Sequence, residues 1–147
     1  MSDFIEKQIT LKASVSRVWK ALTDHEQFGE WFGVQLDGPF LEGELSHGHI
    51  TYPGFEHLRW ESRTVRIEPE SYFSISWHPY AIDPDADYSQ ETPTLVEFRL
   101  EEKDGGTLLA VRESGFDKLP PERRSEAFRM NDKGWGIQMQ NIAEYVG

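Results

Sequence analysis

The chain has 147 residues and a formal net charge of −11, with 26 acidic and 15 basic residues. This charge opposes binding to nucleic acid or to an anionic membrane. The absence of cysteine excludes disulfides, a cysteine nucleophile and thiolate-held metal clusters. The length fits one soluble domain over residues 1–147. No apolar run reaches the ~20 residues of a membrane span, and the N-terminus lacks a signal-peptide core, so we expect a cytoplasmic location.

The first third of the chain predicts a strand followed by two short helices. Residues 4–12 carry apolar side chains at roughly every second position, which indicates a half-buried strand. Ser14 can cap a helix over residues 15–24, whose apolar residues have helical spacing. Residues 25–32 predict a second short helix, and residues 33–43 are interrupted by glycines and a proline.

A run of strands follows, at residues 44–52, 58–68, 72–78, 94–102 and 107–116. In the third of these, Phe73, Ile75 and Trp77 alternate with polar or amphipathic residues and should face the core. Residues 80–93 are acidic and rich in turn formers, which is typical of a mobile loop. Residues 104–106 (Asp-Gly-Gly) predict a hairpin turn between the last two strands.

The chain ends with a long predicted helix over residues 121–146. A proline is tolerated in its first turn, and its apolar residues recur at intervals of three, four and seven residues. Gly134 and Gly136 flank Trp135 and indicate either a kink or a close backbone approach to a strand or ligand. Strands gathered before one long helix predict an α+β fold in which a curved antiparallel sheet packs on that helix.

Seven short motifs, in order along the chain, resemble those of the START-like (SRPBCC, birch-pollen-allergen-like) superfamily. They are Val18–Asp24, Trp31-Phe32, Val65–Pro69, Phe73–Trp77, Gly105–Thr107, Glu113–Phe116 and Gly134-Trp135. Within the superfamily, the chain most resembles the homologues of the activator of the heat-shock-protein-90 ATPase. The resemblance implies a helix-grip fold over nearly the whole chain. Residues 53–59 and 80–93 depart from the family pattern.

The resemblance also implies an apolar pocket between the sheet and the long helix. The chain contains five Trp, nine Phe and five Tyr, and such aromatics either line a cavity or pack as core. The candidate ligand-binding residues are those that periodicity turns inward: Trp31, Phe32, Phe73, Ile75, Trp77, Phe98, Val111, Glu113, Phe128, Trp135 and Met139.

Two groups of polar residues are candidates for chemistry. Glu113 shares a strand face with Leu109 and Val111. An inward carboxylate could act in proton transfer, with His78 and Glu61 as candidate partners, or orient a polar ligand group.

His47 and His49 point to one strand face and could begin a metal site with Glu44 or Glu61 as a third ligand. Exposed histidines near a turn are the simpler interpretation of this pair, and the sequence implies no cofactor.

Three hypotheses for function follow from the sequence. The first is binding of a small hydrophobic, aromatic or lipid-like ligand in the internal cavity. The second is a chaperone partner, which the resemblance to the ATPase activator implies and which acidic loops would contact. The third is a cyclase-like or aromatase-like enzyme with Glu113 as the candidate catalytic residue. The oligomeric state does not follow from the sequence.

Overall fold

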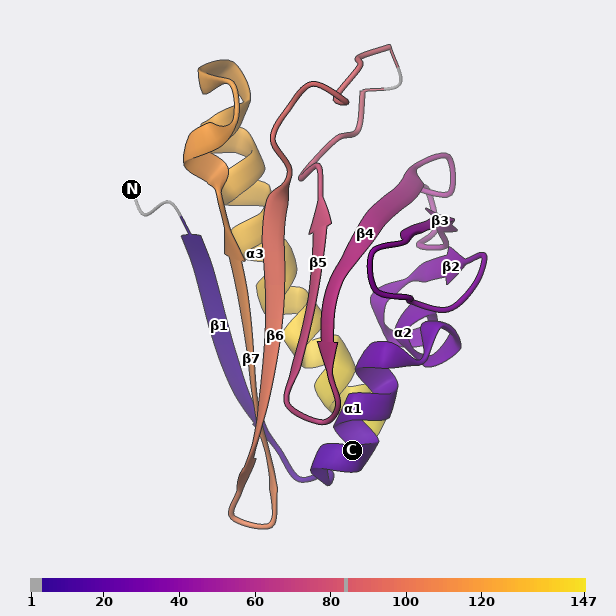
Figure 1. The fold of residues 1–147 in the computed structure, drawn as a ribbon, viewed down its shortest axis with the longest axis vertical. Coiled ribbons are helices and arrows are strands. Elements are labelled where there is room, and N and C mark those ends of the chain that lie inside the picture. Colours follow the sequence, from indigo (N-terminus) through magenta and orange to yellow (C-terminus); the bar gives the residue numbers. More distant parts are fainter. Residues whose placement is uncertain (1–3, 84) are drawn as a thin grey trace.

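The computed structural model describes residues 4–83 and 85–147 and shows a curved sheet with a long helix along one face (Figure 1). The strands are β1 (Phe4–Leu11), β2 (Val34–Leu36), β3 (Leu45–Ile50), β4 (Arg59–Glu68), β5 (Tyr72–Trp77), β6 (Thr94–Lys103) and β7 (Gly106–Ser114). The helices are α1 (Val15–Thr23), α2 (His25–Phe32), the short 3-10 helix η1 (Phe116–Lys118) and α3 (Pro121–Val146).

The strands form one antiparallel sheet in the order β1-β7-β6-β5-β4-β3-β2. Only the step from β1 to β7 joins strands that are distant in sequence, and Phe4 pairs there with Ser114. The predicted turn after β6 is a tight hairpin in which Asp104 and Gly105 have φ values of 53° and 81°. The helix-grip fold expected from the sequence is confirmed.

Two neighbouring strands of the sheet, β4 and β5, are paired over only part of their length. The ladder between β4 and β5 ends at the pair Arg63 and Ser76, so residues 59–62 of β4 have no partner on β5. Figure 1 shows β4 bending away from β5 at this end. The opening between the two strands positions the site described below.

Local sequence accounts for the two helices that follow β1. The Ser14 side chain accepts a hydrogen bond from the backbone N–H of Arg17 and caps α1. Asp24 caps α2 in the same way, through the backbone N–H of Glu26, and Gly33 ends α2 in the left-handed region. The predicted helix at residues 25–32 has the observed bounds of α2.

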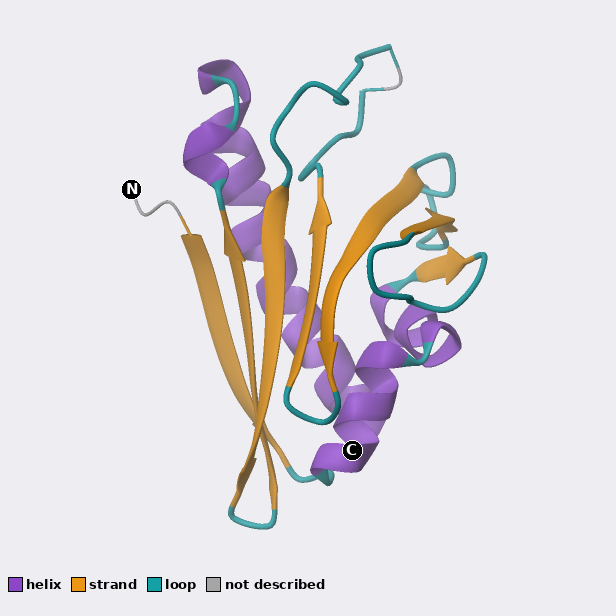
Figure 2. Ribbon diagram, viewed as in Figure 1, coloured by secondary structure: helices purple, strands orange, loops and turns teal. Residues whose placement is uncertain are grey.

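Helix α3 lies along the concave face of the sheet, with α1 and α2 at the end where α3 finishes (Figure 2). Its buried residues are Ala127, Trp135, Met139 and Ile142, which follow the helical spacing read from the sequence. A Cβ atom at Gly134 or Gly136 would meet nothing within 4 Å, so neither glycine marks a close backbone approach.

Strand β2 is an element that the sequence does not predict. It has three residues and lies inside the glycine-rich stretch. Gly48 of β3 makes its pairing possible, because a Cβ atom at this position would lie 2.1 Å from the carbonyl oxygen of Gln35. Gly48, which lies between His47 and His49, therefore allows β2 and β3 to approach closely.

A continuous cluster of aromatic rings fills the space between the sheet, α2 and α3. Phe28 packs on Trp31, Phe32, Phe40 and Trp60 with ring centroids 4.9 to 5.8 Å apart. The cluster continues from Phe32 to Trp77 and Trp135, and from Trp135 to Phe98. It therefore joins β4, β5, β6, α2 and α3 into one core.

Within residues 4–83 and 85–147, no helix combines the length and the apolar character that a membrane crossing requires.

Candidate functional site

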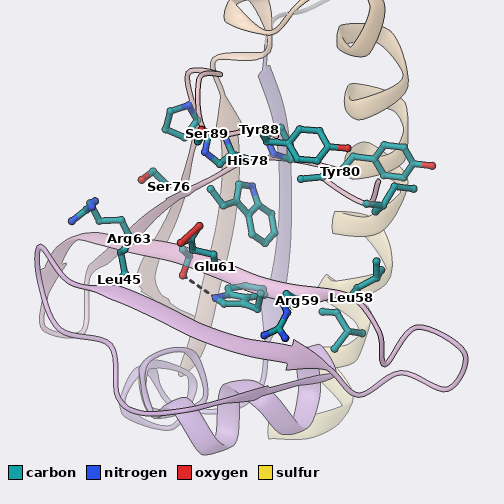
Figure 3. Close-up of a pocket in the computed structure, with 18 of the residues that line it drawn as sticks. Leu45, Leu58, Arg59, Glu61, Arg63, Ser76, His78, Tyr80, Tyr88 and Ser89 are labelled. Atoms are coloured by element: carbon teal, nitrogen blue, oxygen red, sulfur yellow. Dashed lines mark hydrogen bonds between the residues drawn. The ribbon is translucent and has the colours of Figure 1, made fainter. Parts of the chain in front are cut away.

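A pocket of about 710 Å³ lies where β4 and β5 part. Its walls come from both strands, from residues 79–82, 87–89 and 93, and from Asn131 of α3. Figure 3 shows Tyr80 and Tyr88 on the side of α3, with Leu45 and Arg63 on the opposite side. A volume of this size suits a drug-sized small molecule.

Three aromatic rings of the core cluster reach the pocket and form its floor. They belong to Phe32, Trp60 and Trp77, whose ring centroids lie 5.1 to 6.3 Å apart in edge-to-face contacts. The indole N–H of Trp60 donates to Ser62 Oγ at 2.9 Å, and that of Trp77 donates to Glu113 Oε2 at 2.7 Å. Because both indole N–H groups are engaged inside the protein, the rings offer apolar surface to the pocket.

Charged and polar side chains form the rim of the pocket. Glu61 lies 3.2 Å from His47 Nε2, and Arg63 donates to the carbonyl oxygen of Gly43 at 2.6 Å. His78 also lines the pocket, and its buried Nδ1 has no hydrogen-bond partner among the described residues. Hydrogen bonds from the side chain and then the backbone of Ser89 lower the pKa of the Asp87 carboxyl. The rim can therefore meet polar groups of a ligand while the floor meets apolar ones.

Arg123, near the start of α3, holds the segment that forms the outer wall. Its guanidinium donates to both carboxylate oxygens of Glu91, at 2.8 and 2.7 Å. These hydrogen bonds raise the pKa of Arg123, against the opposing effect of burial. The pair joins the predicted acidic loop to the helix.

Glu113 lies beneath the floor and accepts four hydrogen bonds. Trp77 Nε1 and Thr94 Oγ1 donate to Oε2 at 2.7 and 2.5 Å, and Asn131 Nδ2 and Trp135 Nε1 donate to Oε1 at 2.9 and 2.8 Å. The side chain has no exposed surface. Because Trp77 and Asn131 also line the pocket, Glu113 fixes two pocket residues from inside the core.

The structure divides the eleven ligand-binding residues predicted from the sequence into three groups. Phe32 and Trp77 line the pocket. Glu113 and seven others are buried in the core: Trp31, Phe73, Ile75, Phe98, Val111, Trp135 and Met139. Phe128 is half-buried and packs on Phe116 with ring centroids 5.2 Å apart. The pocket therefore touches α3 through Asn131 and opens through the sheet, to one side of the predicted cavity.

Sequence reasoning missed most of the residues that line the pocket, among them Trp60, Tyr88 and Asn131. Trp60 alternates with Ser62 and Thr64 on the inward face of β4, so the period of two could have found it. Nothing in the sequence pattern marks Asn131, because its role depends on the distant residue Glu113.

The predicted histidine pair lies on the outer face of β3. Both His47 and His49 are exposed, and they stand opposite Glu61 and Arg59 on β4. In the part of the chain that the structure describes, no group of three or more His, Asp or Glu side chains is arranged to hold a metal ion.

Comparison with solved structures shows the same fold in several proteins of low sequence identity. MLL2253 from Mesorhizobium loti has a TM-score of 0.75 and 20% identity, over 97% of this chain and 95% of that one. The Aha1 dimer from Colwellia psychrerythraea has a TM-score of 0.72 and 16% identity, over 99% and 96%. DynU16, from the dynemicin biosynthetic locus, has a TM-score of 0.74 and 21% identity over 99% of this chain, which spans 47% of its length.

A search among curated proteins found no match. A family profile described as activator of Hsp90 ATPase homolog 1-like protein matches residues 12–147. The match agrees with the motifs read from the sequence and with the helix-grip fold. The chain belongs to the family of activator of Hsp90 ATPase homolog 1-like proteins.

Proposed function

We propose that the protein binds a small molecule with a flat apolar part in the pocket between β4, β5 and residues 79–82 and 87–89. The observation that carries this proposal is the floor of Phe32, Trp60 and Trp77 at the base of a pocket of about 710 Å³. The other rings of the core cluster are buried, whereas these three border open space. Aromatic floors with a few polar groups around them are typical of ligand sites.

The contacts of Glu113 support binding rather than proton transfer. A general acid or base must come within hydrogen-bond reach of its substrate. Glu113 has no exposed surface, and both of its oxygens accept hydrogen bonds from neighbouring side chains. Its role in this proposal is to orient Trp77 and Asn131, so the ligand meets those residues and not the carboxylate.

The test uses N-phenyl-1-naphthylamine, a neutral aromatic probe whose fluorescence rises in apolar surroundings. We expect saturable binding with quenching of Trp fluorescence and an increase in melting temperature. Ser76→Trp places a bulky side chain in the pocket and should weaken binding at least about tenfold. Ser125→Trp makes the same change on the exposed side of α3, outside the pocket, and should bind like the wild type.

Two results would contradict this proposal. One is a wild-type protein that neither binds the probe nor carries a small molecule when native mass spectrometry is applied to it as purified. The other is equal binding by the wild type and Ser76→Trp, because the probe would then occupy another surface.

A second candidate function is binding to an Hsp90-type chaperone, which the description of the family suggests. The observation that favours it is a pair of exposed rings before β4, Tyr52 at 65% and Phe55 at 49% exposure, with centroids 5.9 Å apart. Exposed aromatic residues are enriched at protein interfaces. If this function holds, the protein should change ATP turnover by a purified Hsp90, and Tyr52→Ser with Phe55→Ser should abolish the change.

A further inference from the structure

Arg123 makes an unusually complete set of contacts with the segment that connects β5 to β6. Its side chain is 18% exposed and that of Glu91 12%. Besides the two hydrogen bonds to Glu91, its Nη1 donates to the carbonyl oxygen of Tyr80 at 3.0 Å and its Nη2 to that of Pro79 at 2.9 Å. One side chain thus holds the beginning and the end of the segment together.

The same guanidinium also contacts the middle of the segment. It lies over the ring of Tyr88, 4.6 Å from the centroid, and the hydroxyl of Tyr88 accepts a hydrogen bond from the backbone N–H of Asp83 at 3.1 Å. A planar guanidinium can donate hydrogen bonds to a carboxylate and to carbonyl oxygens while its face stacks on an aromatic ring. An ammonium group lacks this planar arrangement of donors. Arg123 therefore contacts the segment at its start, its middle and its end.

The segment between β5 and β6 is not paired with the sheet, so the contacts with Arg123 are what hold it in place. The pairing of β5 with β6 ends at Trp77 and Thr94. Tyr80, Ile82 and Tyr88 nevertheless line the pocket, and Figure 3 shows Tyr80 and Tyr88 on the side of α3. Arg123 and Glu91 do not line the pocket themselves.

We propose that Arg123 is a positioning residue for the pocket: by holding residues 79–83 and 85–91 against the start of α3, it sets the outer wall and thereby the affinity for ligand. This inference rests on the proposed function, since the affinity in question is that of the same pocket. Arg123 and Glu91 would then determine the affinity for ligand although neither of them lines the pocket. Glu91, one carboxylate of the acidic segment, thereby has a structural role.

The experiment compares Arg123→Lys with Arg124→Lys. Lysine keeps the charge and loses the fork that contacts Glu91, the two carbonyls and Tyr88. Arg124 is the matched control, because it lies next on the helix and donates to the carbonyl oxygens of Asp117 and Leu119, away from the segment. The readouts are the Kd of N-phenyl-1-naphthylamine, the rate of chymotrypsin cleavage after Tyr88 in the absence of probe, and the urea midpoint.

We expect Arg123→Lys to weaken probe binding about fivefold or more and to raise cleavage after Tyr88 about tenfold, at a urea midpoint close to that of Arg124→Lys. Glu91→Gln should also weaken probe binding. The binding free energy lost in the double variant should be smaller than the sum of the losses in the two single variants. Equal Kd values and equal cleavage rates for Arg123→Lys and Arg124→Lys would overturn the inference. If the wild type binds no probe, the proposed function fails, and the cleavage rates still decide whether Arg123 holds the segment.

Discussion

Glu113 is a carboxylate inside the core whose four partners are all neutral donors. They come from β5, β6 and α3, so one side chain connects three elements around β7. A buried carboxylate is tolerated only where hydrogen bonds replace the water it has lost. The sequence places Glu113 inward through the alternation of β7, and the structure adds that it serves the packing of Trp77, Trp135 and Asn131.

Glu113→Gln tests this role directly. Glutamine keeps the shape but replaces one acceptor oxygen by an NH₂ group, which must then face a donor such as Trp135 Nε1. We expect the free energy of unfolding to fall by about 2 to 4 kcal/mol, since a buried donor loses its partner. Urea unfolding followed by circular dichroism measures the change.

The matched control for this prediction is Glu101→Gln, an exposed glutamate of β6. Its effect on the free energy of unfolding should stay within about 0.5 kcal/mol. If Glu113→Gln behaved like Glu101→Gln, the network around Glu113 would contribute little to stability, and its inward position would need another explanation.

Tyr72 gives a pH-dependent prediction on the outer face of the sheet. Burial and the 2.6 Å hydrogen bond from its hydroxyl to Glu97 raise the pKa of Tyr72 above its ordinary value of 10.0. The folded state therefore holds the phenol proton more tightly than the unfolded state. The resulting stability is fully present below pH 10.0 and is lost as the pH rises from 10.0 through the folded-state pKa.

Comparing the wild type with Tyr72→Phe isolates this effect. The difference in unfolding free energy between the two proteins should decrease as the pH rises above 10.0. The phenolate absorbance of the wild type should contain a late component that Tyr72→Phe lacks. A difference that stays constant from pH 9 to 12 would show that Tyr72 titrates as an unperturbed phenol (about pH 10).

At the scale of elements, the glycines of α3 and β3 predict opposite outcomes for the same substitution. Gly134→Ala and Gly136→Ala should each raise the free energy of unfolding by about 0.5 to 1 kcal/mol, because alanine favours helix and a Cβ atom meets nothing within 4 Å. Gly48→Ala should lower it, because the new Cβ atom would collide with the carbonyl oxygen of Gln35. Thermal unfolding of the three variants checks both signs at once. A loss of stability at Gly134 or Gly136 would show that the backbone of α3 needs glycine there.

The long elements could be predicted from the sequence because each has an uninterrupted period. Residues 94–102 alternate over their whole length and form most of β6, and the apolar spacing of residues 121–146 gives α3 with its observed bounds. Strand β2 could not be predicted, because three residues are too few to show a period. It exists through its pairing with β3, which is a tertiary contact.

The pocket could be predicted in part only. Phe32 and Trp77 were found because alternation and helical spacing turn them inward. The position of the pocket was missed, because residues 58–68 read as one strand although only the second half of β4 pairs with β5. A sequence pattern shows which face a side chain occupies and does not show where two neighbouring strands part.

At the scale of the whole molecule, the aromatic cluster connects elements from both ends of the chain. Four of the five tryptophans belong to it: Trp31 of α2, Trp60 of β4, Trp77 of β5 and Trp135 of α3. The sheet also depends on distant segments, since β1 pairs with β7. Neither the sheet nor α3 can bury its apolar face without the other, so we expect them to unfold together.

This cooperativity predicts that urea unfolding gives one transition with the same midpoint by Trp fluorescence and by far-ultraviolet circular dichroism. Fluorescence reports on the cluster, whereas circular dichroism reports on all helices and strands, and α1 contributes Trp19 outside the cluster. Trp135→Phe should shift both midpoints equally, because it weakens the contact between α3 and the sheet that both signals share. If fluorescence changed before circular dichroism, the cluster would open while the strands stayed paired. The region around the pocket would then form a separate, weaker unit of the fold.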